Sequence, residues 1–188
     1  KNFGHYGVSI EDGCDNIHIL GNTFYDGGAG GIKINGADAE GEAFNLTYGN
    51  EISDNEISFC GRKYFAGCGV LLMHSFENTV SHNDIHDLYY SGISVGWVWG
   101  YKPTVCRDNI IEKNHIYNLG DGLLSDMGGI YLLGYQPGTI VRGNLIHDVN
   151  ARHYGGWGIY TDEGSSYITV ENNICYNFSN NAYHQHFG

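Results

Sequence analysis

The sequence predicts an all-β protein, a single-stranded parallel β-helix of about six coils, and two repeated patterns lead to this fold class. The first pattern is an apolar residue, two variable residues, Asn, one variable residue and an apolar residue; it occurs six times, with 28 to 33 residues between successive asparagines. The second pattern is a Gly followed by alternating apolar residues, and it also occurs six times. Self-similarity at a period of 20–50 residues is typical of solenoids. Because the apolar positions are mostly Ile and Val at a period of two, the repeated unit is built from strands.

Each coil is expected to contain two or three short strands. The Gly-led strands cover residues 7–10, 31–34, 69–72, 92–95, 129–132 and 158–161. The other strands flank the repeated asparagines, which are Asn22, Asn55, Asn83, Asn114, Asn144 and Asn173. Coils stack at about 4.8 Å, so each repeat position lies on itself in the next coil. The six asparagines are therefore predicted to form a structural ladder at one inner corner, and residues 1–188 to be one β-helix segment of a longer β-helix domain.

Composition excludes several classes of protein. The net charge is −12 and the nine Lys and Arg residues are scattered, so we expect no nucleic-acid partner. There is no apolar run of about 20 residues, so no membrane partner is expected. The five cysteines include no CxxC pair, which argues against a zinc site, and we expect no metal and no cofactor. A disulfide between Cys60 and Cys68 is kept as an alternative, but we favour unpaired thiols at both positions.

Departures from the repeat indicate where a binding site lies, because solenoids place insertions on one face. Five insertions flank the Gly-led strand, at residues 35–49, 59–67, 96–108, 118–128 and 148–157. Together they are expected to wall a cleft over that strand.

Alternation along the last Gly-led strands selects the side chains that face this cleft. Outward positions carry Tyr131, Tyr160, Asp162, His184 and His186, where an ordinary outer strand would carry Ser, Thr or Lys. Three indoles lie close to these strands, and we interpret them either as platforms for a pyranose ring or as caps on the core: Trp97, Trp99 and Trp157. His153, together with His184 and His186, is assigned to substrate hydrogen bonding.

Three carboxylates are candidates for acid catalysis, which needs two carboxyl groups in different environments. Asp162 and Glu163 end the sixth Gly-led strand, and Asp126 precedes the fifth. In an extended arrangement Asp126 and Asp162 would be roughly 20 Å apart. They can meet only if the 118–128 insertion folds back over the strand; otherwise Glu163, Asp121 or a carboxylate outside this segment must be the partner.

The sequence around these residues resembles that of bacterial right-handed parallel β-helix carbohydrate-active enzymes, and is most similar to glycoside hydrolase family 141. The resemblance spans about residues 60–188 and is most specific in two runs, Gly128-Gly129-Ile130-Tyr131-Leu132-Leu133-Gly134 and Gly156-Trp157-Gly158-Ile159-Tyr160-Thr161-Asp162-Glu163-Gly164. It extends to His184-Gln185-His186. This resemblance implies fucosidase or xylanase activity on plant cell-wall glycans, with Asp126 and Asp162 as the catalytic pair.

We therefore expect a glycoside hydrolase that acts on polysaccharide glycans by carboxylate-pair acid/base chemistry, is secreted by a bacterium and works outside the cell or in the periplasm. Two alternatives stay open: a polysaccharide lyase or epimerase on the same fold, and a non-catalytic glycan-binding β-helix. The net charge of −12 disfavours the uronate substrates of the lyase class. Linkage specificity, stereochemistry and oligomeric state are not determined at this stage.

Overall fold

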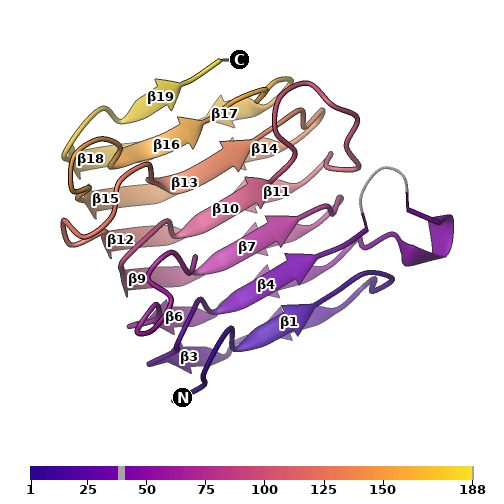
Figure 1. Cartoon of the computed structure of the whole chain (residues 1–188), viewed down its shortest axis with the longest axis horizontal. Coiled ribbons are helices and arrows are strands. Elements are labelled where there is room, and N and C mark those ends of the chain that lie inside the picture. Colours follow the sequence, from indigo (N-terminus) through magenta and orange to yellow (C-terminus); the bar gives the residue numbers. More distant parts are fainter. Residues whose placement is uncertain (38–40, 188) are drawn as a thin grey trace.

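The structure, a computed structural model, describes residues 1–37 and 41–187. Within these residues the chain forms 19 strands in three parallel sheets, and each coil contributes one strand to each sheet (Figure 1). The prediction of an all-β parallel β-helix of about six coils is confirmed, with three strands per coil. One short 3₁₀ helix, η1 (Ala43–Asn45), lies in the first insertion.

Sheet 1 contains the Gly-led strands and faces the viewer in Figure 1. Its members are β1 (Val8–Ile10), β4 (Ile32–Asn35), β7 (Val70–Met73), β10 (Ile93–Gly96), β13 (Gly128–Leu133), β16 (Trp157–Thr161) and β19 (Tyr183–Gln185). Equivalent residues pair directly, so Ile93 is in register with Val70 on one side and Ile130 on the other. The register therefore stacks each buried position of the repeat on the same position of the next coil.

Sheets 2 and 3 contain the strands before and after the repeated asparagines. Sheet 2 consists of β2 (His18–Leu20), β5 (Glu51–Ser53), β8 (Thr79–Ser81), β11 (Ile110–Glu112), β14 (Ile140–Arg142) and β17 (Thr169–Glu171). Sheet 3 consists of β3 (Thr23–Tyr25), β6 (Glu56–Ser58), β9 (Asp84–Leu88), β12 (His115–Leu119), β15 (Leu145–Val149) and β18 (Ile174–Phe178).

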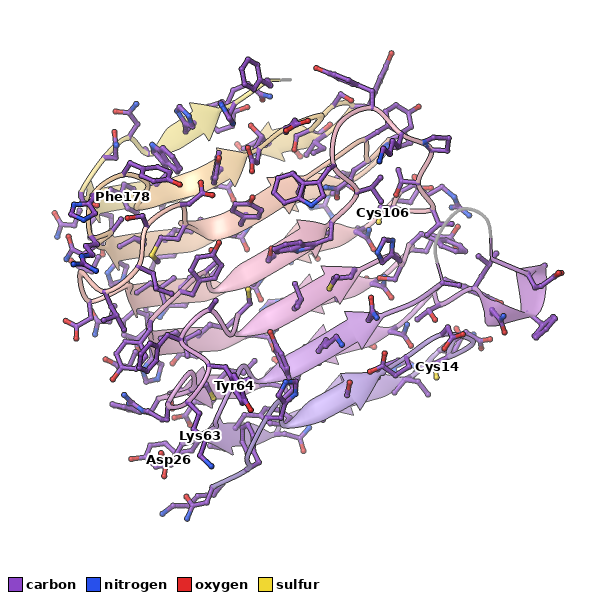
Figure 2. All side chains as sticks on the ribbon, in the orientation of Figure 1. Cys14, Asp26, Lys63, Tyr64, Cys106 and Phe178 are labelled. Carbon is purple, nitrogen blue, oxygen red and sulfur yellow. The ribbon has the colours of Figure 1, made fainter. Side chains whose placement is uncertain are left out.

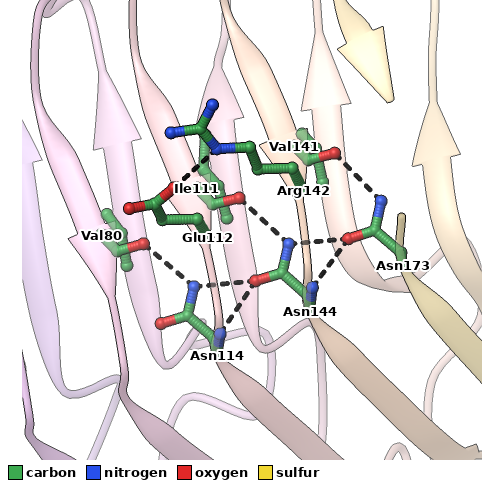
Figure 3. A network of polar contacts seen from close by, with 8 residues as sticks. All are labelled: Val80, Ile111, Glu112, Asn114, Val141, Arg142, Asn144 and Asn173. Carbon is green, nitrogen blue, oxygen red and sulfur yellow. Dashed lines mark hydrogen bonds and ion pairs between the residues drawn. The ribbon is translucent and has the colours of Figure 1, made fainter. Parts of the chain in front are cut away.

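The predicted asparagine ladder is present at the corner between sheets 2 and 3 (Figure 3). Asn114 Nδ2 donates to Asn144 Oδ1 at 3.0 Å, and Asn144 Nδ2 donates to Asn173 Oδ1 at 2.9 Å. The Asn114 amide also donates to the carbonyl of Val80 at 3.0 Å, which satisfies backbone at the bend. The ladder is structural, because its side chains hydrogen bond one another and the strand bends.

A second ladder was not predicted. Asn50 Nδ2 donates to Asn78 Oδ1 at 3.0 Å, and Asn78 Nδ2 donates to Asn109 Oδ1 at 2.9 Å. The equivalent residue of the next coil is Thr139, whose hydroxyl accepts from Asn109 N at 3.4 Å. Because only part of the coils carry Asn at this position, no six-fold sequence pattern reveals it.

The outer face of sheet 3 carries stacked rings. The rings of His86, Tyr117, His147 and Tyr176 follow one another at centroid distances of 4.8, 5.2 and 4.8 Å. His86 and His147 each hydrogen bond to the aspartate that follows them, Asp87 and Asp148, at 2.6 Å. These two His-Asp pairs repeat with the coil and lie in the stack, so we interpret them as structural.

All five cysteines are free, as favoured. Among residues 1–37 and 41–187, no helix has the length and apolar character needed to cross a bilayer.

Candidate active site

Asp162 lies directly after β16, and hydrogen bonds hold both its backbone and its side chain. Its backbone N–H donates to Leu132 O of the neighbouring strand at 2.8 Å. Tyr131 OH donates to Asp162 Oδ2 at 2.5 Å, and His186 Nδ1 lies 2.8 Å from Asp162 Oδ1. The residue is only 4% exposed. Since a carboxylate only accepts hydrogen bonds, both neighbours donate, and His186 carries its proton on Nδ1.

Asp126 lies in the loop of residues 120–127, between β12 and β13. Its Oδ1 accepts a hydrogen bond from Tyr160 OH at 3.2 Å. Its backbone is held at both ends, because Asp126 N donates to Tyr154 O at 2.9 Å and Tyr90 OH donates to Asp126 O at 2.8 Å. The loop therefore folds back to Tyr160, which is the condition set above for Asp126 to meet Asp162.

The loop of residues 150–156 supports this folded-back course. Arg152 N donates to Leu124 O at 2.7 Å, and Gly156 N donates to Met127 O at 2.8 Å. Gly155 has a φ of +92°, and a Cβ at this position would come within 2.8 Å of the backbone nitrogens of Asp126 and Met127. Only glycine permits the two loops to approach this closely.

The two carboxyl groups have opposite pKa shifts. Burial and the negative charge of Asp162 raise the pKa of Asp126 above its usual value, against smaller opposing effects of Tyr160 and His186. Burial also raises the pKa of Asp162, but hydrogen bonds from Tyr131 and His186 outweigh it and hold this pKa below its usual value. Neighbouring carboxyl groups whose pKa values are driven apart can serve as acid and base in one reaction.

Both carboxyl groups line one pocket of about 340 Å³ over the last coils of sheet 1. Loops from opposite ends of the strands enclose it, because Trp99 comes from residues 97–109 and Tyr154 from residues 150–156 (Figure 1). The remaining lining residues are Trp157, Tyr160, Glu163, His184 and His186. Trp157 and His184 stack at 4.2 Å with an interplanar angle of 5°. The pocket thus presents flat rings beside carboxylates and imidazoles.

The outward side chains of sheet 1 are more buried than alternation alone suggests. Tyr131, Leu133, Trp157 and Tyr160 form a second apolar cluster outside the main core, and all are at most 6% exposed. Trp97 covers this cluster by stacking on Tyr131 at 5.9 Å, and its Nε1 donates to Ser94 Oγ at 3.0 Å. Tyr131 therefore acts beneath the pocket, through Asp162.

Most of the residues singled out from the sequence meet at this pocket. Three of them, Tyr131, Trp97 and His153, are not in its lining. His153 is exposed, and its backbone N–H donates to Ser125 Oγ at 3.2 Å. Sequence reasoning missed Tyr154, in the pocket wall, and Tyr90, which holds Asp126 from the preceding coil. The one available signal for Tyr154 was its position beside His153 in the 148–157 insertion.

Comparisons with known proteins agree with this architecture. The profile of the family described as "Right handed beta helix region" matches residues 1–126. A solved structure entitled "Glycoside hydrolase" superposes with a TM-score of 0.81 at 24% sequence identity, over 97% of this chain. The chain spans 33% of the length of that structure. No curated protein matches the sequence.

Proposed function

We propose that this chain, which belongs to the right-handed β-helix family, carries the active site of a glycoside hydrolase. One observation carries the proposal: Asp126 and Asp162 share a pocket in which the pKa of one is raised and that of the other is lowered. Glycoside hydrolysis needs one carboxyl group protonated and one ionised at the same pH. The solved structure of similar fold has a title that names the same reaction class, which adds support.

In the proposed mechanism, Asp126 is the acid and Asp162 is the base or nucleophile. Asp126 gives its proton to the glycosidic oxygen as the bond to the anomeric carbon breaks. Asp162 either removes a proton from a water that attacks this carbon, or attacks the carbon itself. In the second case water then hydrolyses the glycosyl ester on Asp162 while Asp126 takes the proton of that water, so one water is added overall by either route. Tyr131 and His186 keep Asp162 ionised, and the rings of Trp157, Tyr160 and His184 lie where a sugar would bind.

The pocket chemistry favours a neutral glycan. Among its lining residues within the described part of the chain there is no Lys or Arg, while Asp126, Asp162 and Glu163 are acidic. A uronate would meet like charges without a compensating cation, and this argues against the lyase alternative. An extracellular or periplasmic location, where cell-wall polysaccharides are met, forms part of the proposal.

Product masses test the reaction. The protein would be incubated with soluble xylan, xyloglucan and galactomannan beside two variants, Asp126→Asn and Asp162→Asn. Products heavier by one water, lost in both variants and kept in the exposed control Asp12→Asn, are expected. Unsaturated products without added water would establish a lyase, and full activity of both pocket variants would refute the site.

Stability tests the roles of the two carboxyl groups independently of activity. The fold opposes ionisation of Asp126, whose pKa is raised, so Asp126→Asn is expected to raise the unfolding temperature at pH 7. Asp162 has a lowered pKa, and its contribution to stability is present above the unfolded value and is lost as pH falls through the folded one. Asp162→Asn is therefore expected to lower the unfolding temperature at pH 7. Equal effects of the two substitutions would contradict the assignment.

A further inference from the structure

A second pocket, of about 440 Å³, lies where the strands of sheet 3 end. Three of its residues occupy equivalent positions in successive coils, Asp87 in β9, Asn118 in β12 and Asp148 in β15. All three have positive φ values between 51° and 55°. Asp121 and Asn150, which follow these strands, complete this polar wall. The coil repeat therefore places a row of carboxylates and amides along one side of the pocket.

Much of the hydrogen-bonding capacity of this wall is unused. Asp87 engages His86 through Oδ2 alone. Within the described residues, the side chains of Asn118, Asp121 and Asn150 make no hydrogen bond to another side chain or to the backbone, and all three are exposed. These groups are available to a ligand, with carboxylate oxygens as acceptors and amide nitrogens as donors.

The rest of the lining includes Arg62 and two aromatic rings, Phe59 and Tyr89. The guanidinium of Arg62 lies 5.3 Å from the ring centroid of Phe59 and 5.1 Å from that of Tyr89, and Nη1 donates to Tyr89 OH. Within the described residues Arg62 makes no ion pair. It comes from the 59–67 insertion, which also bears the exposed residues Lys63 and Tyr64 (Figure 2).

This mixed lining selects a neutral polar ligand. A cation entering the pocket would meet Arg62, which is always charged, and an anion would meet Asp87, Asp121 and Asp148. A sugar ring avoids both penalties, because its hydroxyls donate to carboxylates and accept from amides and guanidinium, while its C–H faces pack on aromatic rings. The volume also lies within the range of small-ligand pockets, about 300–1,000 Å³.

We propose that this pocket is a second sugar-binding site, which holds a remote unit of the same neutral polysaccharide that enters the candidate active site. This inference rests on the proposed function for the identity of the polysaccharide. The paired 120–127 and 150–156 loops contribute to both pockets, with Asp121 and Asn150 in the second pocket and Asp126 and Tyr154 in the candidate active site. Asp121 and Asp126 are five residues apart, so their Cα atoms are at most about 18 Å apart. One glycan chain can therefore reach both pockets.

Native affinity electrophoresis tests binding without hydrolysis. The Asp162→Asn variant would be run in gels containing soluble xylan, xyloglucan or galactomannan, with and without Asp121→Ala and Arg62→Ala added. We expect at least one polysaccharide to retard the parent variant, and the two additional substitutions to weaken retardation about tenfold. Asp12→Ala, an exposed carboxylate on an early coil, is the control and is expected to change nothing.

Kinetics separate this site from the catalytic one. With the active protein, Asp121→Ala and Arg62→Ala are expected to raise KM for the long polysaccharide about tenfold and to leave kcat and the hydrolysis of short oligosaccharides unchanged. Retardation that is unchanged by both substitutions, or the absence of retardation by all three polysaccharides, would overturn the proposal of a second site. So would stabilisation by Ca²⁺ that Asp121→Ala abolishes, since the carboxylates would then hold a cation. Retardation that depends on Asp121 without any hydrolysis would refute only the proposed catalysis.

Discussion

Removing one hydroxyl, in Tyr131→Phe, tests how the protein keeps Asp162 ionised. Tyr131 is 1% exposed, and its OH donates to Asp162 Oδ2 at 2.5 Å. A hydrogen bond to a charged group contributes about 1.5–3 kcal/mol, and one pKa unit corresponds to about 1.36 kcal/mol. Loss of this donor is therefore expected to raise the pKa of Asp162 by about one to two units. His186 keeps its own hydrogen bond to Oδ1, so the shift is partial.

The assay is the pH profile of kcat/KM on the polysaccharide that the protein hydrolyses best. If Asp162 must be ionised, its pKa sets the acidic limb of this profile. In Tyr131→Phe that limb is expected to move to higher pH by about one to two units, while activity recovers at higher pH. Tyr135→Phe, which alters a partly exposed tyrosine after β13, is the matched control and is expected to leave the profile unchanged.

Two results would refute this reasoning. An acidic limb that stays in place would mean that Tyr131 does not determine the ionisation of Asp162. A uniform loss of activity at all pH values, with an unchanged unfolding temperature, would mean that the hydroxyl acts on geometry or substrate instead.

Three further predictions concern the supports of the site and of the fold. Tyr90→Phe removes the 2.8 Å hydrogen bond to Asp126 O and is expected to lower kcat/KM two- to tenfold, which corresponds to about 0.5–1.5 kcal/mol. The sheet content measured by circular dichroism should not change, and unchanged kinetics would contradict the prediction. Asn114→Ala removes the side chain from four buried hydrogen-bonding partners and should lower the free energy of unfolding, measured in urea, by about 3–5 kcal/mol. Asn173→Ala, whose ladder contacts are partly buried, should lower it less, and the reverse order would disprove the ladder's role. Burial lowers the pKa of His115, so its neutral form contributes stability that is complete above the unfolded pKa of about 6.5 and is lost as the pH falls below that value. His115→Gln should therefore reduce the fall in unfolding temperature between about pH 7 and 5, and an unaltered slope would exclude this cause.

The fold was largely predictable because a β-helix uses the same local solution in every coil. Asn114 and Asn144 can be assigned to a ladder from spacing alone, since the bend that each occupies recurs at a nearly constant interval. Where the repeated residue varies the same reasoning fails, as at Thr139, which takes the place of Asn in the second ladder. Burial of the outer face was also missed, because Trp97 covers Tyr131 from the 97–109 loop, whose sequence does not follow the repeat.

The site was only partly predictable. Alternation placed Tyr160, Asp162, His184 and His186 on the outer face, and the structure brings all four to one pocket. Asp126 was a conditional candidate, because sequence spacing put it roughly 20 Å from Asp162 along extended strands. Their roles as acid and base stay a proposal.

By itself, the sequence determined the coil, its strands and its asparagine ladder, because repeated short-range patterns specify repeated backbone pairing. Only the tertiary structure decided which carboxyl groups share a pocket and how their pKa values differ. The physical reason is that the course of the 120–127 loop depends on single long-range contacts. Tyr90 reaches Asp126 from 36 residues away, and Tyr154 accepts the Asp126 N–H from the next loop. Within the described residues these contacts do not repeat from coil to coil, so no periodicity in the sequence predicts them, yet they place the second carboxyl group of the proposed reaction.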